Sequence, residues 1–246
     1  MWKLLFAVVT AGLLIYFLWK RMPYILYINK ASKKMDEKNY SEALIYFRKG
    51  AKFNSVSPMV KISYAFNELK YGDIKTAKKQ LMMIISDRNI KQNFRYEAKA
   101  IYALVLLVEG DIPEAKETLM EVYENYKNTN IYCSLGYLIN VSDDYETALK
   151  FNLEAYDYNG DKEVIMDNLG QCYYLGKEYD KAEEIYVKLM EKEPKFPEAY
   201  YNYGLVLKEK GRKDEAVKMF KKALECPFNR LSTVTSKEVE EALENC

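Results

Sequence analysis

The sequence predicts an all-α protein in which about six helix pairs stack into a solenoid with a C-terminal capping helix, preceded by one transmembrane helix. Three observations support this prediction. Small residues recur every 34 positions, an uncharged run lies near the N-terminus, and the 246 residues include only 10 glycines and 6 prolines. Helical repeats need few chain-breaking residues, and their apolar faces account for a hydrophobic content of 49%.

The N-terminal segment, residues 1–22, has the features of a membrane anchor. An uncharged run extends from Leu4 to Trp19 and, with Trp2 included, the apolar stretch has 18 residues. As a helix it would be roughly 27 Å long, close to the ~30 Å hydrocarbon core of a bilayer. Trp2 and Trp19 lie at its two ends, where amphipathic rings favour the headgroup level. Pro23 is expected to end this helix.

The alternative for this segment is a cleaved signal peptide, whose apolar region is only slightly shorter. The residues after the run favour an uncleaved anchor, because Lys20 and Arg21 follow it rather than the small residues of a cleavage site. Cations cluster after the run, whereas only Lys3 and the α-amino group precede it. The positive-inside rule therefore predicts a single-pass protein of the cell membrane whose C-terminal region lies in the cytoplasm.

Residues 23–230 contain an internal repeat with a period of 34 residues. This period separates the members of two sets of small residues, which are Gly136, Gly170 and Gly204, and Ala148, Ala182 and Ala216. The fifth unit reads Met166-x-x-Leu169-Gly170-x-x-Tyr173, then Ala182-x-x-x-Tyr186, then Pro194. The sixth reads Tyr200-x-x-Tyr203-Gly204-x-x-Leu207, then Ala216-x-x-x-Phe220, then Pro227. This pattern resembles the tetratricopeptide repeat (TPR).

The resemblance covers about 205 of the 246 residues, in units near 24–57, 58–91, 96–128, 129–162, 163–196 and 197–230. It implies antiparallel helix pairs that stack into a right-handed superhelix. The second unit departs most, because Glu68 takes the place of a large apolar residue. The distance from Ala65 to Ala103 is 38 residues, which predicts four extra residues in a longer loop near 87–94. In residues 231–246, Thr235-Ser-Lys-Glu238 predicts a capped final helix.

The resemblance also implies where a ligand binds. In TPR proteins the first helix of each unit lines a concave groove through repeat positions two, five, six, nine and twelve. We therefore assign to a peptide-binding groove the residues Tyr137, Asn140, Asp167, Asn168, Gln171, Tyr174, Tyr201 and Asn202. The basic residues of a carboxylate clamp are absent there. Asn168 and Asn202 share position six, where some TPR proteins bind a peptide backbone with an asparagine ladder. An ordinary consensus asparagine is the alternative.

The charges of the chain are divided along its length. Residues 1–100 carry 19 basic and 7 acidic side chains, a net of +12, and residues 101–246 carry 18 and 29, a net of −11. We expect the basic proximal repeats to contact the anionic inner leaflet, which leaves the acidic distal repeats available to a basic partner. Ordinary solvated helix faces are the alternative. No RNA- or DNA-binding motif accompanies the basic residues, so no nucleic-acid partner is expected.

Composition excludes several kinds of function. The chain has no histidine, which rules out a Ser-His-Asp triad and His-ligated metal sites. It contains no glycine-rich phosphate loop, and its four cysteines are far apart, as is typical of reduced packing residues. We expect neither enzyme activity nor a metal or cofactor. The sequence predicts a membrane-anchored scaffold that binds a protein or peptide segment in bacterial envelope assembly, translocation or division. The alternative is a structural protein whose repeats stack between chains as a homo-oligomer.

Overall fold

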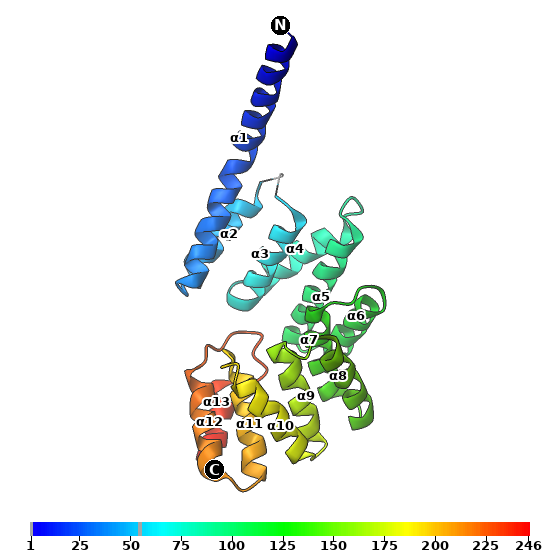
Figure 1. The fold of residues 1–246 in the computed structure, drawn as a ribbon, viewed down its shortest axis with the longest axis vertical. Helices are drawn as coiled ribbons and strands as arrows, with labels where there is room; N and C mark the ends of the chain where they lie inside the picture. The colour runs from blue at the N-terminus through cyan, green and yellow to red at the C-terminus, as the bar shows by residue number, and fades with distance from the viewer. Residues whose placement is uncertain (1, 54–55) are drawn as a thin grey trace. The chain divides into compact units, whose positions relative to one another are not determined.

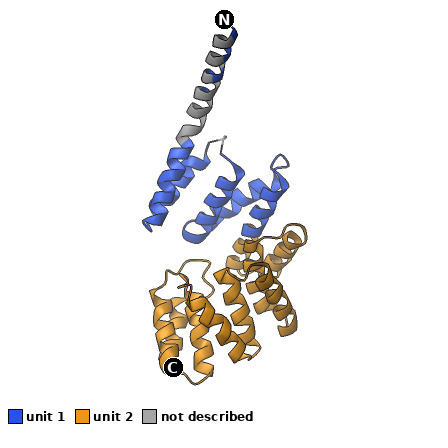
Figure 2. Cartoon of the chain, in the orientation of Figure 1, with its two compact units in different colours: residues 1–101 blue, residues 102–246 orange. Residues whose placement is uncertain are grey.

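The structure is a computed structural model that describes residues 2–53 and 56–246, without the side chains of residues 3–5, 7–9, 11, 13–15 and 17–23. These described ranges contain thirteen helices and no strand, as the all-α prediction requires (Figure 1). The chain divides into two compact units, residues 1–101 and 102–246 (Figure 2). The charge division found in the sequence falls at this boundary, because the first unit carries a net charge of +12 and the second −11.

The first unit is a row of helices, of which the first four pack each on the next. It comprises α1 (Trp2–Asp36), α2 (Tyr40–Ala51), α3 (Pro58–Tyr71), α4 (Ile74–Ser86) and the beginning of α5 (Gln92–Glu109). α1 packs on α2, α2 on α3 and α3 on α4. Ala31, Phe47 and Tyr64 form a buried cluster that joins the first three helices. Asp73 caps α4 by accepting a hydrogen bond from the Thr76 amide.

The expectation that Pro23 ends the first helix is wrong, because α1 continues without a break from Trp2 to Asp36. Proline removes one backbone hydrogen bond and crowds a carbonyl of the preceding turn, but a long helix can bridge such a defect when its turns are held on either side. The part of α1 after Pro23 is held by α2, against which Ala31 is completely buried. The predicted first helix of the first repeat is therefore the C-terminal part of α1.

The four extra residues of the third repeat lie in a helix rather than in a long loop. α5 has 18 residues, whereas the equivalent helices α3 and α7 (Thr129–Ser142) have 14 each. Residues 87–91 alone separate α4 from α5. Arg95, in the first turns of α5, donates from Nε to the Ile85 carbonyl at 2.9 Å and so ties α5 to the end of α4. The insertion lengthens α5 by about one turn.

The second unit has the pairwise stacking of a TPR-like α-solenoid. After the end of α5 it comprises α6 (Ile112–Asn125), α7, α8 (Tyr145–Asn159), α9 (Glu163–Leu175), α10 (Tyr179–Met190), α11 (Pro197–Glu209), α12 (Lys213–Glu225) and α13 (Ser236–Glu244). Each of these helices packs on its successor, and α9 also contacts α7 and α11. The four cysteines are free thiols, and Cys172 is buried in α9.

The small residues of the repeat allow the two helices of a pair to approach closely. A Cβ atom added at Gly170 would lie 2.7 Å from the ring of Tyr186, and one added at Gly204 would lie 2.5 Å from the ring of Phe220. Both separations are shorter than a carbon–carbon contact allows. Gly136 differs, because its added Cβ would meet the amide oxygen of Asn152 at 2.6 Å. The repeat's glycine thus faces a ring in two pairs and an amide in a third.

The predicted capping helix is present as α13. Thr235 accepts a hydrogen bond from the Glu238 amide at 3.2 Å, and the Thr235 amide donates to Glu238 Oε2 at 2.7 Å, which completes the expected capping box. Val239 is completely buried against the preceding repeat.

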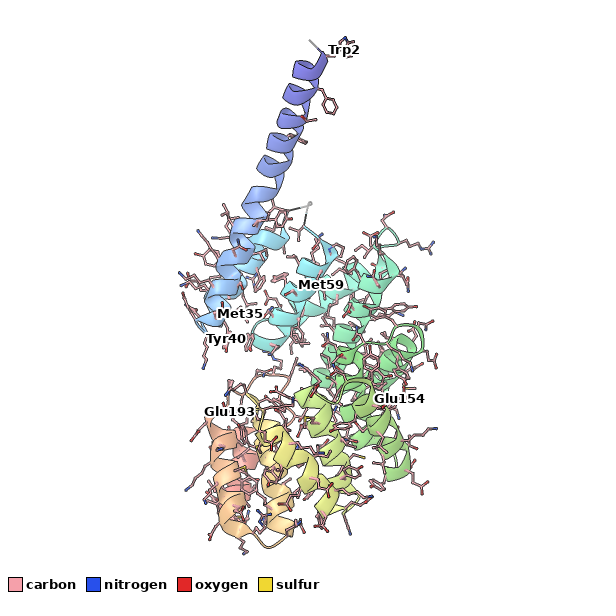
Figure 3. All side chains as sticks on the ribbon, in the orientation of Figure 1. Trp2, Met35, Tyr40, Met59, Glu154 and Glu193 are labelled. Atoms are coloured by element: carbon pink, nitrogen blue, oxygen red, sulfur yellow. The ribbon has the colours of Figure 1, made fainter. Side chains whose placement is uncertain are left out.

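Across the part of the chain that the structure describes, no helix combines the length and the apolar character needed to cross a membrane. Among the predicted anchor residues, Trp2 is 83% exposed and lies at the far end of α1 (Figure 3). The side chains of Trp19, Lys20 and Arg21 lie outside the described residues.

Candidate peptide-binding face of the second unit

The eight predicted groove residues come from α7, α9 and α11, the first helices of the last three repeats. The structure separates them into two groups of four. The buried residues are Asn140, Asp167, Asn168 and Asn202, each no more than 9% exposed. The partly exposed residues are Tyr137, Gln171, Tyr174 and Tyr201.

The buried asparagines connect one repeat to the next. Asn168 Nδ2 in α9 donates to the Cys133 carbonyl of α7 at 2.8 Å. Asn140 Nδ2 in α7 donates to the Asn168 carbonyl at 2.8 Å. Asn202 Nδ2 in α11 donates to Asp167 Oδ1 at 3.1 Å. Both asparagines of the predicted ladder thus make hydrogen bonds within the chain, and their binding of a ligand backbone stays a prediction.

Sequence reasoning missed Asn152, which belongs to the same network. It lies in α8, is completely buried, and donates from Nδ2 to Asn140 Oδ1 at 2.8 Å and to the Ala148 carbonyl at 3.0 Å. The signal in the sequence is a polar residue on the apolar face of a helix, between Phe151 and Ala155. The Nδ2 group of Asn152 has the partners that a buried polar group needs, whereas its Oδ1 is buried without a hydrogen bond among the described residues.

Asp167 is a buried carboxylate at the centre of three helices. Its Oδ1 accepts hydrogen bonds from the Tyr186 hydroxyl of α10 and from Asn202 Nδ2, both at 3.1 Å. Burial raises its pKa to about 7, and the charge of Glu198 acts in the same direction, while the two hydrogen bonds oppose the shift. The Asp167 carboxyl is therefore a structural group that changes its charge near neutral pH.

The partly exposed tyrosines interact with acidic side chains. Burial raises the pKa of Tyr137, and the charges of Glu198 and Glu238 raise it further. Burial also raises the pKa of Tyr201, with additions from Glu238 and Glu241. Glu238 of α13 thus interacts electrostatically with both Tyr137 of α7 and Tyr201 of α11. We define the tyrosine face as Tyr137, Tyr174, Tyr201, Glu238 and Glu241.

Tyr174 joins the same face from α9. Burial raises its pKa, and the charges of Glu209, Tyr179 and Tyr201 contribute after burial. Its ring centroid lies 5.9 Å from that of Tyr179, which holds the side chain in place. The first helices of three successive repeats thus each supply one tyrosine.

The C-terminal segment fixes the acidic part of the tyrosine face. The Thr233 amide donates to Glu198 Oε1 of α11 at 2.6 Å, and Val234 is buried in the core cluster of the last two repeats. The capping box then fixes the start of α13, so that Glu238 has a defined position. The sequence predicts this helix as a cap, but nothing in its pattern shows that Glu238 and Glu241 face the tyrosines.

The chemistry of this face suits cations. The face of a tyrosine ring attracts Lys and Arg side chains, and carboxylates accept their charged hydrogen bonds. Among the described residues, no group of three or more Cys, Asp or Glu side chains is placed to hold a metal ion.

Comparison with known proteins identifies two repeats directly. Residues 166–195 and residues 197–226 each match a tetratricopeptide repeat family model. The "Photosystem I assembly protein Ycf3" of Prochlorococcus marinus (strain MIT 9211) is 28% identical over 127 residues, which cover 50% of this chain and 68% of that protein. The protein of the same name from a second strain of Prochlorococcus marinus is 28% identical over 147 residues, 56% of this chain and 79% of that protein.

Solved structures show the same fold at low identity. A tetratricopeptide repeat protein from Parabacteroides merdae ATCC 43184 has a TM-score of 0.68 at 14% identity, over 90% of this chain and 83% of that chain. Pseudomonas aeruginosa pilF has a TM-score of 0.61 at 14% identity, over 92% and 99%. A chain of the Cut9-Hcn1 complex has a TM-score of 0.71 at 17% identity, over 95% and 45%. The fold is a TPR-like α-solenoid.

Proposed function

We propose that the protein is a non-catalytic TPR scaffold that binds a basic, extended segment of a partner protein on the tyrosine face. The observation that carries this proposal is that Tyr137 and Tyr201 both interact with the carboxylate of Glu238 in α13, while Tyr174 interacts with Tyr201 and with Glu209 of α11. Tyrosine rings give a binding surface large contact area at little entropic cost, and the carboxylates select for Lys and Arg. TPR solenoids are protein-binding architectures, which supports a partner of this kind.

The proposed process is the assembly of a protein complex. The two curated relatives are named as assembly proteins, and they match about half of this chain. Within that class, bacterial envelope assembly, translocation or division is the specific proposal, because the sequence also carries the features of an anchor.

Membrane attachment through residues 1–22, with the repeats on the cytoplasmic side, is part of the proposal. The uncharged run from Leu4 to Trp19, followed by Lys20 and Arg21, supports it, as does the net charge of +12 on the first unit. Carbonate extraction of membranes that contain the full chain tests it. We expect the full chain in the membrane pellet and a chain without residues 1–21 in the supernatant. Release of the full chain by carbonate would contradict the anchor.

Peptide binding is tested with the full chain in neutral detergent micelles by fluorescence anisotropy. The probe is a fluorescein-labelled peptide with the core Lys-Leu-Phe-Lys between Gly-Ser arms, which we call the basic probe. The test variant combines Glu238→Gln with Glu241→Gln, because glutamine retains the capping box and removes only charge. The matched control combines Glu240→Gln with Glu244→Gln, two exposed residues of the same helix.

We expect the test variant to weaken binding of the basic probe at least fivefold and the control to change it less than twofold. Tyr137→Ala with Tyr201→Ala should weaken it at least tenfold, whereas the exposed Tyr158→Ala in α8 should not. Equal effects of test and control variants would show that the tyrosine face does not select the peptide.

Self-assembly is a second candidate function, favoured by the opposite net charges of the two units. The basic unit of one chain would then bind the acidic unit of another. Sedimentation velocity of the full chain in neutral detergent tests this. Oligomers that dissociate when salt is raised from about 0.05 to 0.5 M would support electrostatic self-assembly, since salt shortens the Debye length. A monomer at both salt concentrations would exclude it.

A further inference from the structure

The second repeat lacks a large buried side chain that the later repeats place between their helices. At repeat position four, the last three units have Tyr132, Met166 and Tyr200, and each of these side chains is at most 9% exposed. The second unit has Lys61 at this position. A lysine keeps its charged end in water and so cannot fill a core as a ring does.

A cavity of about 360 Å³ occupies the place where this bulk is missing. Its walls come from the end of α2, from α3, and from α4 with the loop that follows it. The volume lies at the lower end of the range of small-ligand pockets, ~300–1,000 Å³. We call this cavity the second-repeat pocket. Its residues are not those that line the groove of TPR proteins, because Lys61 occupies position four and the other basic residues belong to the end of the preceding helix.

The basic lining of the pocket consists of Arg48, Lys52 and Lys61, against one acidic residue, Asp87. Arg48 is held in place, because its Nη2 donates to Glu68 Oε1 at 2.8 Å and its Nε donates to the Tyr64 hydroxyl at 3.3 Å. Glu68 neutralises Arg48, so the excess of positive charge in the pocket comes from Lys52 and Lys61, beside an arginine that is fixed in advance.

Glu68 explains why the arginine keeps this position. It is completely buried at repeat position eleven, where the sixth unit has Leu207, and it also accepts a hydrogen bond from the Asp73 amide at 3.0 Å. A buried carboxylate needs a cation, so Arg48 cannot move away without a large cost. The departure of this repeat from the pattern thus builds a charged site.

The side of the pocket formed by α4 and the loop after it carries the apolar residues Met83, Ile84 and Ile90 beside Gln80 and Asp87. Ile84 is 3% exposed, and Met83 beside it is 58% exposed. A methionine at a pocket is adaptable in shape and accommodates different apolar groups. Cations and aliphatic groups in one pocket fit a ligand that has a carboxylate next to an apolar group.

We propose that the second-repeat pocket binds an acidic peptide segment, with one carboxylate against Arg48, Lys52 and Lys61 and a neighbouring apolar side chain against Met83 and Ile84. A peptide fits better than a flat lipid surface, because the pocket is a cavity between helices with apolar residues in its lining. The protein then binds segments of opposite charge at two sites, one in each unit.

The test uses the full chain in neutral detergent micelles and a fluorescein-labelled peptide with the core Glu-Leu-Phe-Glu between Gly-Ser arms and an amidated C-terminus, the acidic probe. Lys52→Gln with Lys61→Gln should weaken its binding at least tenfold. The matched control is Lys75→Gln with Lys79→Gln, two exposed lysines of α4 that do not line the pocket, and it should change binding less than twofold.

A third variant separates loss of the site from loss of the fold. Lys61→Tyr restores the consensus bulk, so it should fill the pocket and abolish binding of the acidic probe without lowering the thermal midpoint. The basic probe should bind all of these variants normally, since it uses the tyrosine face. Failure of the pocket proposal can therefore be told from failure of the proposed function, because binding of each probe is weakened by a different set of variants.

Three results would overturn the pocket proposal. The acidic probe could bind the Lys61→Tyr variant within twofold of the wild type, or a probe with glutamine in place of glutamate could bind equally well. Phosphatidylglycerol added to the micelles could displace the acidic probe where phosphatidylcholine does not, which would make the pocket a lipid-headgroup site.

Discussion

The two units of the protein have the same 34-residue repeat and fill it in different ways. In the second unit, position four holds the buried side chains Tyr132, Met166 and Tyr200, and buried amides make hydrogen bonds from one repeat to the next. In the first unit, the second repeat has Lys61 and Glu68 at consensus apolar positions, together with a cavity. The repeat frame thus holds a buried carboxyl group in two ways, as the partner of a cation at Glu68 and with a raised pKa at Asp167.

The two units also differ in the charge of the ligand that we propose for each. The first unit has a net charge of +12 and a pocket with three basic residues, while the second has −11 and a face where tyrosines adjoin carboxylates. Interfaces gain specificity from such complementary charge more than they gain affinity. The predictions below test whether the two units differ in packing as they differ in charge.

The largest expected effect concerns the two cores. Leu189→Ala in the second unit should lower the free energy of unfolding by about 3–5 kcal/mol, because Leu189 is completely buried among close-packed groups. Ile84→Ala in the first unit removes as many carbons but should cost only about 2 kcal/mol, because Ile84 already borders a cavity. Urea denaturation followed by circular dichroism measures both. Equal costs would show that the cavity does not loosen the first unit.

The next effect concerns the buried charge of the first unit. Arg48→Met should lower the free energy of unfolding by about 2 kcal/mol, because Glu68 then stays buried without its cation. Adding Glu68→Leu, which copies Leu207 of the sixth repeat, should restore stability to within about 1 kcal/mol of the wild type. The same denaturation experiment compares the single and the double variant. A double variant less stable than the single one would mean that the charges are needed for the fold itself.

Asp167 gives the second unit a dependence on pH. Its pKa is raised from 3.8 to about 7, so the native state holds this proton more tightly than the unfolded state does. The contribution of Asp167 to stability therefore falls as pH rises from 3.8 to about 7, by about 2–4 kcal/mol, and is constant above that window.

Asp167→Asn should remove this fall, so that the variant gains stability relative to the wild type as pH increases through the window. The control is Asp161→Asn, whose side chain is 96% exposed and should leave the pH profile unchanged. Urea denaturation at pH 4, 5.5 and 7.5 measures the profile. A constant difference between Asp167→Asn and the wild type at all three pH values would refute the raised pKa.

The smallest effect concerns the amides between repeats. Asn168→Ala should lower the free energy of unfolding by about 1–2 kcal/mol, because the Cys133 carbonyl loses its donor. The partly exposed Gln171→Ala should cost less than about 0.5 kcal/mol. Asn168→Ala with Asn202→Ala should leave binding of the basic probe within twofold of the wild type. A larger loss of binding by a folded variant would support an asparagine ladder that holds the ligand.

Local elements were predictable wherever a few neighbouring residues determine the structure. The capping box at Thr235 was predictable because capping needs only a short side chain and a nearby amide. The ends of α1 and α5 were not predictable in this way. Whether a helix continues beyond a proline or gains a turn depends on the elements that contact it. For α1 that element is α2, and for α5 it is the end of α4.

The candidate site was predicted only in part, for a similar reason. The repeat positions located Tyr137, Tyr174 and Tyr201 on the first helices of three repeats, but they also marked Asn140 and Asn168, whose side chains are buried. Whether a position on a helix is open or covered depends on how closely the next repeat packs. The acidic members of the tyrosine face come from α13, which the repeat pattern does not include.

The sequence by itself determined the helical class, the period of the repeat and the opposite charges of the two halves, because these depend on residue type and spacing along the chain. The tertiary structure alone decided which amides join repeats, where Glu238 lies and that Lys61 leaves a cavity. These features depend on side chains from several helices that meet in space. Contacts between side chains of different helices depend on the distances at which the helices pack. No local pattern of residues encodes those distances.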